Sequence, residues 1–415
     1  MDESPTGRLE LAGPGEARAL AARVRALAPG AASVTAAVGE IVAGVRAGGD
    51  EALARYVERF DRVDGPLAVS PAELDAALAA LDANVRSGLE TAIANVRAVA
   101  EAGLAADVDV ALPQGQSVRL REVPVRRAGI YVPGGRAPYP STVVMGVVTA
   151  RAAGVDEIVV CAPGGHEVIL AAAALCEADQ VLRMGGAHAV AALAYGTESI
   201  ERVDVVAGPG NLYVQEAKRL VSGDVGIDGF AGPSDLLVLA AAGADPRWVA
   251  LDLLAQAEHG EGTIVCAVSP DRELLNAVAD RVDAEWEGAA AAALVHAGDL
   301  EAALAFAEAF APEHLALAGA DAEALAPRVR SAGCVFVGAE SAVAFGDYVA
   351  GSNHTLPTGG AARFASALSA RTFRRRVSEV RIGPAACALA HAGAPIARAE
   401  GFPRHAASME VRENG

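Results

Sequence analysis

The chain has 415 residues, 53% of them hydrophobic and 21% charged, so it can bury a large core and is neither a disordered segment nor a small disulfide-held scaffold. It carries 52 acidic against 34 basic side chains, and the formal net charge of −18 repels nucleic acid and anionic membrane surfaces. We therefore expect no nucleic-acid or membrane partner.

Cysteine usage and the start of the chain bear on the compartment. The cysteines are odd in number, far apart and outside any CxxC pair, so they predict neither a disulfide framework nor a thiolate zinc site: Cys161, Cys176, Cys266, Cys334 and Cys387. Residues 1–20 lack the basic and apolar segments of a secretory signal, and no apolar run reaches the roughly 18 residues of a membrane helix. We expect a cytoplasmic protein.

The hydrophobic pattern changes along the chain. Between about Glu16 and Leu104 apolar residues recur at helical spacing. Short β-branched runs then alternate with turns and helical segments, first at 121–135, 141–154 and 156–165, which implies a parallel sheet with crossover helices. A second α/β block has a helix over 245–260 and candidate strands within 263–270, 292–298 and 333–340. Near Gly383 the strand signal stops, and the remaining tail is polar and mostly helical, so two sheet domains fit better than one.

Several polar residues could form a metal site. Gln256 and His259 lie three residues apart on a predicted helix, so their side chains leave the same face. The spacing alone favours the plainer alternative, an amphipathic helix with a polar end, since Gln is an uncommon metal ligand. Asp347 precedes a Gly-rich loop and is a plausible carboxylate ligand. With His405 as the fourth donor, this nitrogen and oxygen set suits zinc. His354, in the same loop as Asp347, is either a substrate contact or a solvated histidine.

Glu313 and His314 are an adjacent acid and imidazole that follow a proline. Such a pair can supply a carboxylate to activate water and an imidazole to accept protons. The alternative is a carboxylate at a helix N-terminus followed by a surface histidine.

Gly-rich turns follow several predicted strands, including those at 131–135 and 208–211. Their amides could meet a pyrophosphate, but none has the GxGxxG pattern, so ordinary turns remain the default. Ser234, in AGPSD ahead of a predicted strand, contacts a substrate or caps a turn. No GxSxG elbow is present, which disfavours a serine hydrolase.

Taken together, an ordered set of segments between about Arg121 and Arg412 resembles the signature of the histidinol dehydrogenase family: YVPGG, GGAHAVAALAYGTESI, GPGNLYV, GIDGFAGPSD, LLAQAEHG, PEHLAL, GDYVAGSNHTLPT and AEGFPRHAASM. The resemblance implies a zinc-containing homodimer that oxidises L-histidinol to L-histidine with two NAD through an aldehyde-level intermediate, at the end of histidine biosynthesis.

The resemblance also implies roles for individual residues. Glu313 and His314 match the catalytic pair. The zinc ligands would be Gln256, His259, Asp347 and, from the partner subunit, His405. Besides these ligands and His314, the substrate would contact Ser234, His354 and Glu400, and NAD would contact Tyr131, His188 and Asn211. Two departures lie on the cofactor side: His188 stands where the family usually has Gln, and the segment 161–170 is shorter than usual.

With the resemblance, we expect an α/β fold of two Rossmann-like parallel-sheet domains, one inserted in the other. The expected divisions are a helical N-terminal segment (1–20), a discontinuous domain with the zinc and catalytic residues (21–107 and 236–365), an NAD-side domain (108–235) and a helical C-terminal tail that reaches the partner's active site (366–415).

Two other functions compete with this prediction. A related dehydrogenase of another polyol or amino alcohol would share the fold but should differ at Ser234, His354 and Glu400. A structural or regulatory zinc protein would retain the four metal ligands but would not need Glu313 or His314.

Overall fold

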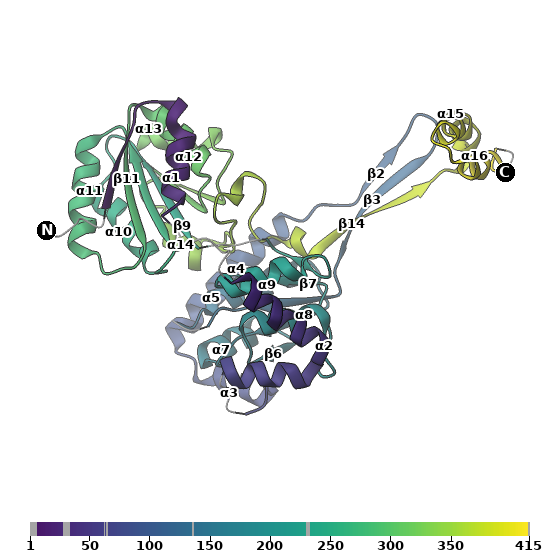
Figure 1. The fold of residues 1–415 in the computed structure, drawn as a ribbon, viewed down its shortest axis with the longest axis horizontal. Coiled ribbons are helices and arrows are strands. Elements are labelled where there is room, and N and C mark those ends of the chain that lie inside the picture. The colour runs from purple at the N-terminus through teal and green to yellow at the C-terminus, as the bar shows by residue number, and fades with distance from the viewer. Residues whose placement is uncertain are drawn as a thin grey trace.

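The computed structural model describes residues 6–27, 34–61, 63, 65–134, 137–229 and 233–413. These residues form two parallel sheets, each with helices on both faces, and an antiparallel sheet that holds the C-terminal helices away from the other two (Figure 1). The prediction of an α/β fold with two Rossmann-like parallel-sheet domains, one inserted in the other, is confirmed. None of the described helices combines the length and apolarity that crossing a membrane requires. All five cysteines are free.

The first sheet is parallel throughout and has six strands in the order β1 (Thr6–Leu11), β11 (Ala291–Ala297), β10 (Ile264–Ser269), β9 (Asp235–Ala240), β12 (His314–Ala318) and β13 (Cys334–Val337). Its helices are α1 (Ala17–Arg25), α10 (Pro246–Ala257), α11 (Arg272–Glu285), α12 (Leu300–Phe310), α13 (Ala320–Glu323) and α14 (Val343–Tyr348). In β9, Leu236 and Val238 pack with α10 and α11, whereas Leu237 and Leu239 pack with α1 and α12. Burial on both faces explains the unbroken apolar run of this strand.

The second sheet has five parallel strands in the order β6 (Gln180–Leu182), β5 (Glu157–Cys161), β4 (Arg127–Tyr131), β7 (Val205–Ala207) and β8 (Gly226–Ile227). Its crossover helices are α7 (Glu167–Leu175), α8 (Gly186–Tyr195) and α9 (Leu212–Val221). The prediction of a strand within 141–154 is wrong, because this run forms α5 (Pro140–Val143), a π-helical turn (Val144–Val148) and α6 (Thr149–Ala152). A short apolar run does not distinguish a buried strand from a buried helix.

The expected division of the N-terminal quarter differs from the structure. Residues 1–20 were expected to be helical, but Thr6–Leu11 form strand β1, which pairs in parallel with β11. The expected first domain included 21–107, yet α2 (Thr35–Phe60), α3 (Pro71–Ala80) and α4 (Ala83–Ala102) pack on the five-stranded sheet and its helices (Figure 1). Helical periodicity predicts an element but not the sheet against which its apolar face packs.

The remaining segments form an arm and a tail. Residues 108–124 were expected in the NAD-side domain, but β2 (Val108–Ala111) and β3 (Ser117–Pro124) pair with β14 (Arg374–Arg381) in an antiparallel sheet. At the far end of this arm α15 (Ala386–Ala399) packs on α16 (Pro403–Glu410), remote from both parallel sheets (Figure 1). The predicted helical tail after Gly383 is therefore confirmed.

Candidate active site

Residues from the two parallel sheets line one cavity of about 500 Å³. From the five-stranded sheet come Tyr131, at the carboxyl end of β4, and Asn211, after β7. The six-stranded sheet supplies Ser234 and the Glu313–His314 pair, at the amino ends of β9 and β12. β4 and β7 lie where the strand order of their sheet reverses, which is the usual ligand site of an open α/β sheet.

Glu313 lies at the end of a chain of hydrogen bonds. Gln256 Nε2 donates to Ser234 Oγ over 2.5 Å, and Ser234 Oγ donates to the Glu313 carboxylate. The same carboxylate oxygen accepts the Asp235 N–H over 3.0 Å. Burial, reinforced by the negative charge of Asp235, raises the pKa of Glu313 to about 8 despite these donors. Glu313 can therefore both hold and release a proton near neutral pH.

His314 is buried beside Glu313 with its two ring nitrogens in different surroundings. Nδ1 lies 3.4 Å from the Asp235 carbonyl oxygen, and Nε2 lies 3.8 Å from Asp347 Oδ1. A proton on Nδ1 satisfies that carbonyl and makes Nε2 the basic nitrogen. Burial lowers the pKa of His314, although Asp347 and Asp235 oppose the shift. The side chain is therefore neutral and able to accept a proton.

Asp347 and His354 form the opposite part of the same pocket. Asp347 Oδ1 lies 4.0 Å from His354 Nδ1, and burial raises the pKa of this carboxyl group while His314 and His259 lower it. Burial likewise lowers the pKa of His354 to about 4. His354 Nε2 is buried without a hydrogen-bond partner among the described residues, although the residue lines the cavity. Such a nitrogen needs a partner from a bound molecule.

Gln256 and His259 lie together at the end of α10, as their spacing predicts. His259 lines the cavity, and its Nδ1 lies 3.1 Å from the Gln256 carbonyl oxygen. This contact with a backbone carbonyl is the usual support of a metal-binding histidine that coordinates through Nε2. Within the described ranges no group of three or more His, Cys, Asp or Glu side chains is placed to hold a metal ion.

The turn after β7 is held rigidly against β4. Lys218, which is fully buried, donates to the Gly208 carbonyl over 3.0 Å, and Asp228 accepts the Gly208 N–H over 2.8 Å. A Cβ at Gly208, whose φ is +127°, would lie 2.0 Å from the Tyr131 carbonyl oxygen, so only glycine fits. Asn211 then caps α9 by accepting the N–H groups of residues 213 and 214.

The structure does not place His188 at the cavity. Its ring is buried and stacks with Tyr56 and Phe60, and Nε2 lies 2.7 Å from Asp61 Oδ2. The cofactor contact of His188 therefore stays a prediction, and in this structure the internal partner of the imidazole is Asp61. Tyr131, by contrast, lines the cavity, and its hydroxyl accepts the Gly186 N–H over 3.1 Å.

Glu400 and His405 also lie away from the cavity of their own chain. Both are exposed, on the tail helices at the end of the antiparallel arm (Figure 1). Of the predicted site residues, the structure thus brings together Tyr131, Asn211, Ser234, Gln256, His259, Glu313, His314, Asp347 and His354.

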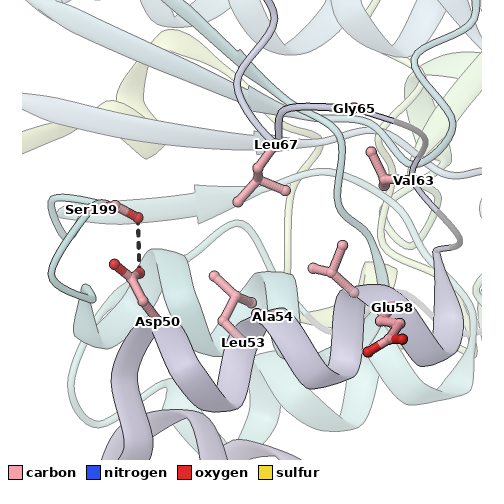
Figure 2. Close-up of a pocket in the computed structure, with 9 residues that line it drawn as sticks. Asp50, Leu53, Ala54, Glu58, Val63, Gly65, Leu67 and Ser199 are labelled. Atoms are coloured by element: carbon pink, nitrogen blue, oxygen red, sulfur yellow. Dashed lines mark hydrogen bonds between the residues drawn. The ribbon is translucent and has the colours of Figure 1, made fainter.

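Figure 2 shows a second hollow, of about 540 Å³, beside the C-terminal half of α2. Its walls are mainly apolar and include Leu53, Val57 and Leu67, and Ser199 donates to Asp50 across one end over 2.8 Å. No residue of the predicted catalytic or metal set lines it. This hollow is therefore separate from the candidate active site.

Sequence reasoning missed Asp235, whose carboxylate contacts Glu313 and Arg25 within the site. The residue follows Ser234 in the AGPSD motif, but a strand-opening aspartate is ordinarily assigned to a turn. Its one available signal was a charge at the start of an otherwise apolar strand.

A sequence model of histidinol dehydrogenases matches residues 27–413. The chain belongs to the histidinol dehydrogenase family. Histidinol dehydrogenase of Cereibacter sphaeroides is 43% identical over 91% of this chain and 92% of its own length. The enzyme of the same name from Synechococcus sp. is 42% identical, with the same coverage.

Solved structures agree with this assignment. The crystal structure of histidinol dehydrogenase from Elizabethkingia anophelis matches with a TM-score of 0.92 over 99% of both chains, at 29% identity. The resemblance predicted from the motifs is therefore confirmed, and the chain is an oxidoreductase of the histidinol dehydrogenase family. An acetylating aldehyde dehydrogenase from Geobacillus thermoglucosidasius, 11% identical with a TM-score of 0.50, shares the fold alone.

Proposed function

We propose that this protein oxidises L-histidinol to L-histidine in two successive steps with two NAD and one zinc ion per site, in histidine biosynthesis. The observation that carries the proposal is the shared cavity. A buried acid and imidazole, Glu313 and His314, face turn residues at the strand-order reversal of the other sheet. A structural zinc protein would need neither the pair nor the second half of the cavity.

The cofactor belongs on the five-stranded side. The carboxyl ends of β4 and β7 are the general dinucleotide position of such a sheet, and Tyr131 and Asn211 line the cavity there. Lys218 and Asp228 fix the intervening turn, so its backbone is preorganised for a ligand. NAD, when bound, accepts one hydride in each step.

Gln256, His259 and Asp347 would hold zinc, together with His405 from a second copy of the chain. Their nitrogen and oxygen donors suit this metal, and the contact of His259 Nδ1 with a backbone carbonyl supports coordination through Nε2. Zinc, when bound, would orient the imidazole and amine of the substrate, and positioning of this kind lowers barriers by about 7–11 kcal/mol. His354, through its unpartnered Nε2, and Ser234 would contact the substrate from the same side.

Glu313 and His314 would transfer protons in different parts of the reaction. In the first step His314 Nε2, which is basic because the ring is neutral, would accept the hydroxyl proton of the alcohol as its carbon loses a hydride. In the second step Glu313 takes a proton from water, and the resulting hydroxide adds to the aldehyde carbon. The alkoxide that forms would take up the proton that His314 gained in the first step. The neutral His314 would then accept a hydroxyl proton of the hydrate as its carbon loses the second hydride.

Each active site would use two chains. Glu400 and His405 are exposed on a tail that the antiparallel arm holds far from its own cavity (Figure 1). The tail also exposes apolar side chains, with Ile396 and Phe402 at least half accessible. Burial of these side chains against a second copy would bring His405 to the partner's Gln256, His259 and Asp347 site, so we propose a homodimer with shared sites.

Product stoichiometry tests the proposal directly. With zinc, L-histidinol and excess NAD, we expect two NADH and one L-histidine for each histidinol consumed. Removal of zinc by a chelator should abolish turnover while the helical circular dichroism remains, because two large cores do not depend on one ion. One NADH per substrate, or turnover of other alcohols alone, would reject the assignment.

A further inference from the structure

Asp235 lies at the start of β9, directly opposite Glu313 in the parallel register of β9 and β12. Its side chain is completely buried. The two residues bond reciprocally: Glu313 N–H donates to Asp235 Oδ1 over 2.8 Å, and Asp235 N–H donates to Glu313 Oε2 over 3.0 Å. At the amino edge of a parallel sheet, each carboxylate thus satisfies a backbone N–H group of the neighbouring strand.

Arg25, at the end of α1, anchors the Asp235 carboxylate. Its guanidinium donates to both oxygens of Asp235, over 2.5 and 3.2 Å, and the pair is largely buried. The same guanidinium donates to the carbonyls of Phe310 and Ala311 over 2.7 and 3.1 Å and lies 3.7 Å above the Phe310 ring. One side chain therefore ties Asp235 to the turn that leads from α12 into Glu313.

That turn is unusually constrained. Ala311 ends α12 with a φ of +49°, in the left-handed region that residues other than glycine rarely adopt. Such a conformation persists only where surrounding contacts enforce it, as the bonds from Arg25 do here. Glu313 follows two residues later, immediately before β12, so the direction of its carboxyl group depends on the Arg25–Asp235 pair.

We propose that Asp235, anchored by Arg25, is the positioning residue that directs the Glu313 carboxyl group at the water that attacks the aldehyde carbon. The inference rests on the proposed function, in which Glu313 activates water. Asp235 also contacts His314, but through its backbone carbonyl. Substitution of the Asp235 side chain should therefore disturb Glu313 more than His314, which keeps its Nδ1 contact and loses only the charge of Asp235 that raises its pKa.

Asp235→Asn is the sharpest variant, because it preserves shape but replaces one acceptor oxygen by an NH₂ group. That group would face a donor, either Arg25 or the N–H of Glu313 or Gly359. We expect kcat with L-histidinal to fall at least tenfold, and kcat for the first hydride transfer from L-histidinol to fall less than threefold. KM for both substrates should change less than threefold, because mispositioned groups lower rates rather than binding.

Glu157→Gln is the matched control. Glu157 pairs with the buried Arg127 at the amino end of β5, the edge away from the cavity. Its loss should lower the melting temperature without changing the ratio of the two rates. Arg25→Lys, which keeps the charge but not the two-pronged geometry, should reproduce the selective loss in weaker form, about threefold, and serves if Asp235→Asn does not fold.

The outcomes are distinguishable. A selective loss of the aldehyde step in Asp235→Asn or Arg25→Lys supports the positioning role. Equal losses in both steps, a change in KM alone, or unchanged rates would overturn it while the wild-type protein still oxidised both substrates. A wild-type protein inactive with both substrates would reject the proposed function and this inference together.

Discussion

The two parallel sheets contribute to the cavity in opposite ways. The five-stranded sheet presents the carboxyl ends of β4 and β7, where glycine-rich backbone is held in place by buried side chains such as Lys218. The six-stranded sheet presents the amino ends of β9 and β12, where buried carboxyl and imidazole groups have shifted pKa values. The comparison suggests that one edge offers a backbone surface for a common cofactor, and the other offers side chains specific to one substrate.

The experiment with the largest expected effect mixes two inactive variants and measures the activity that returns. His405→Ala removes the tail donor, and His314→Asn removes the base, so each variant alone should lose at least 100-fold in activity. If sites are shared and subunits pair at random, half of all dimers in the mixture are heterodimers, and each heterodimer has one intact site of two. About a quarter of the wild-type activity should therefore return.

The control is a mixture of Glu313→Gln and His314→Asn, assayed by the L-histidine formed. Both substitutions lie on the same half of the site, so no heterodimer contains an intact site. Recovery in this control, or its absence in the first mixture, would show that the tail does not complete a partner's cavity.

Substitution of Glu313 and His314 one at a time separates the role of each residue in the two steps. His314→Asn should reduce both hydride transfers by about 10²–10⁴-fold, because both need its proton acceptor. Glu313→Gln should reduce the aldehyde step by a similar factor and the alcohol step far less. Single-turnover rates with each substrate measure the difference, and equal losses in Glu313→Gln would contradict the division of work.

Substitutions near the carboxyl ends of β4 and β7 should change only the binding of NAD. Asn211→Ala removes the cap of α9 and loosens the turn after β7, so we expect KM for NAD to rise about tenfold, as for the loss of one good hydrogen bond, while KM for histidinol stays constant. His188→Gln should change KM for NAD less than threefold, since this side chain faces Asp61 rather than the cavity. A larger increase in KM for NAD in His188→Gln would support the predicted contact of His188 with the cofactor.

The smallest effect is a pH dependence of stability in the metal-free protein. The pKa of Glu313 rises from 4.5 to about 8 in the folded state, so above pH 4.5 the folded protein retains a proton that the unfolded chain has lost. The free energy of unfolding should therefore fall as pH rises, by up to about 1.4 kcal/mol per pH unit until pH 8.

His354 acts in the opposite direction, because burial lowers its pKa from 6.5 to about 4 and stability is lost as pH falls below 6.5. From pH 6.5 to 8 the contribution of His354 is nearly constant, so the difference between the wild-type protein and Glu313→Gln measures the contribution of Glu313. Urea unfolding there should show a declining stability that Glu313→Gln flattens. A slope unchanged in Glu313→Gln would assign the proton to another group.

The sequence predicted the α/β class and eight residues that line the cavity, because strand patterns are local and the motifs are specific. It did not predict that α2 to α4 cover the five-stranded sheet. The pattern of an amphipathic helix shows that one face is buried but not which sheet buries it. Nor did it predict the internal pairing of His188, which requires Asp61, a residue 127 positions away. Asp235 was missed for the same reason, since its partners Arg25 and Glu313 are distant in sequence.

The pairing of β1 with β11 has a consequence for synthesis. Glu10 and His296, which contact each other across these strands, are 286 residues apart. At translation rates of roughly 5–20 residues per second, the first strand emerges roughly 15–60 s before its neighbour. The inserted five-stranded unit can fold on the ribosome during this interval, whereas β1 can join its sheet only after β11 has been synthesised.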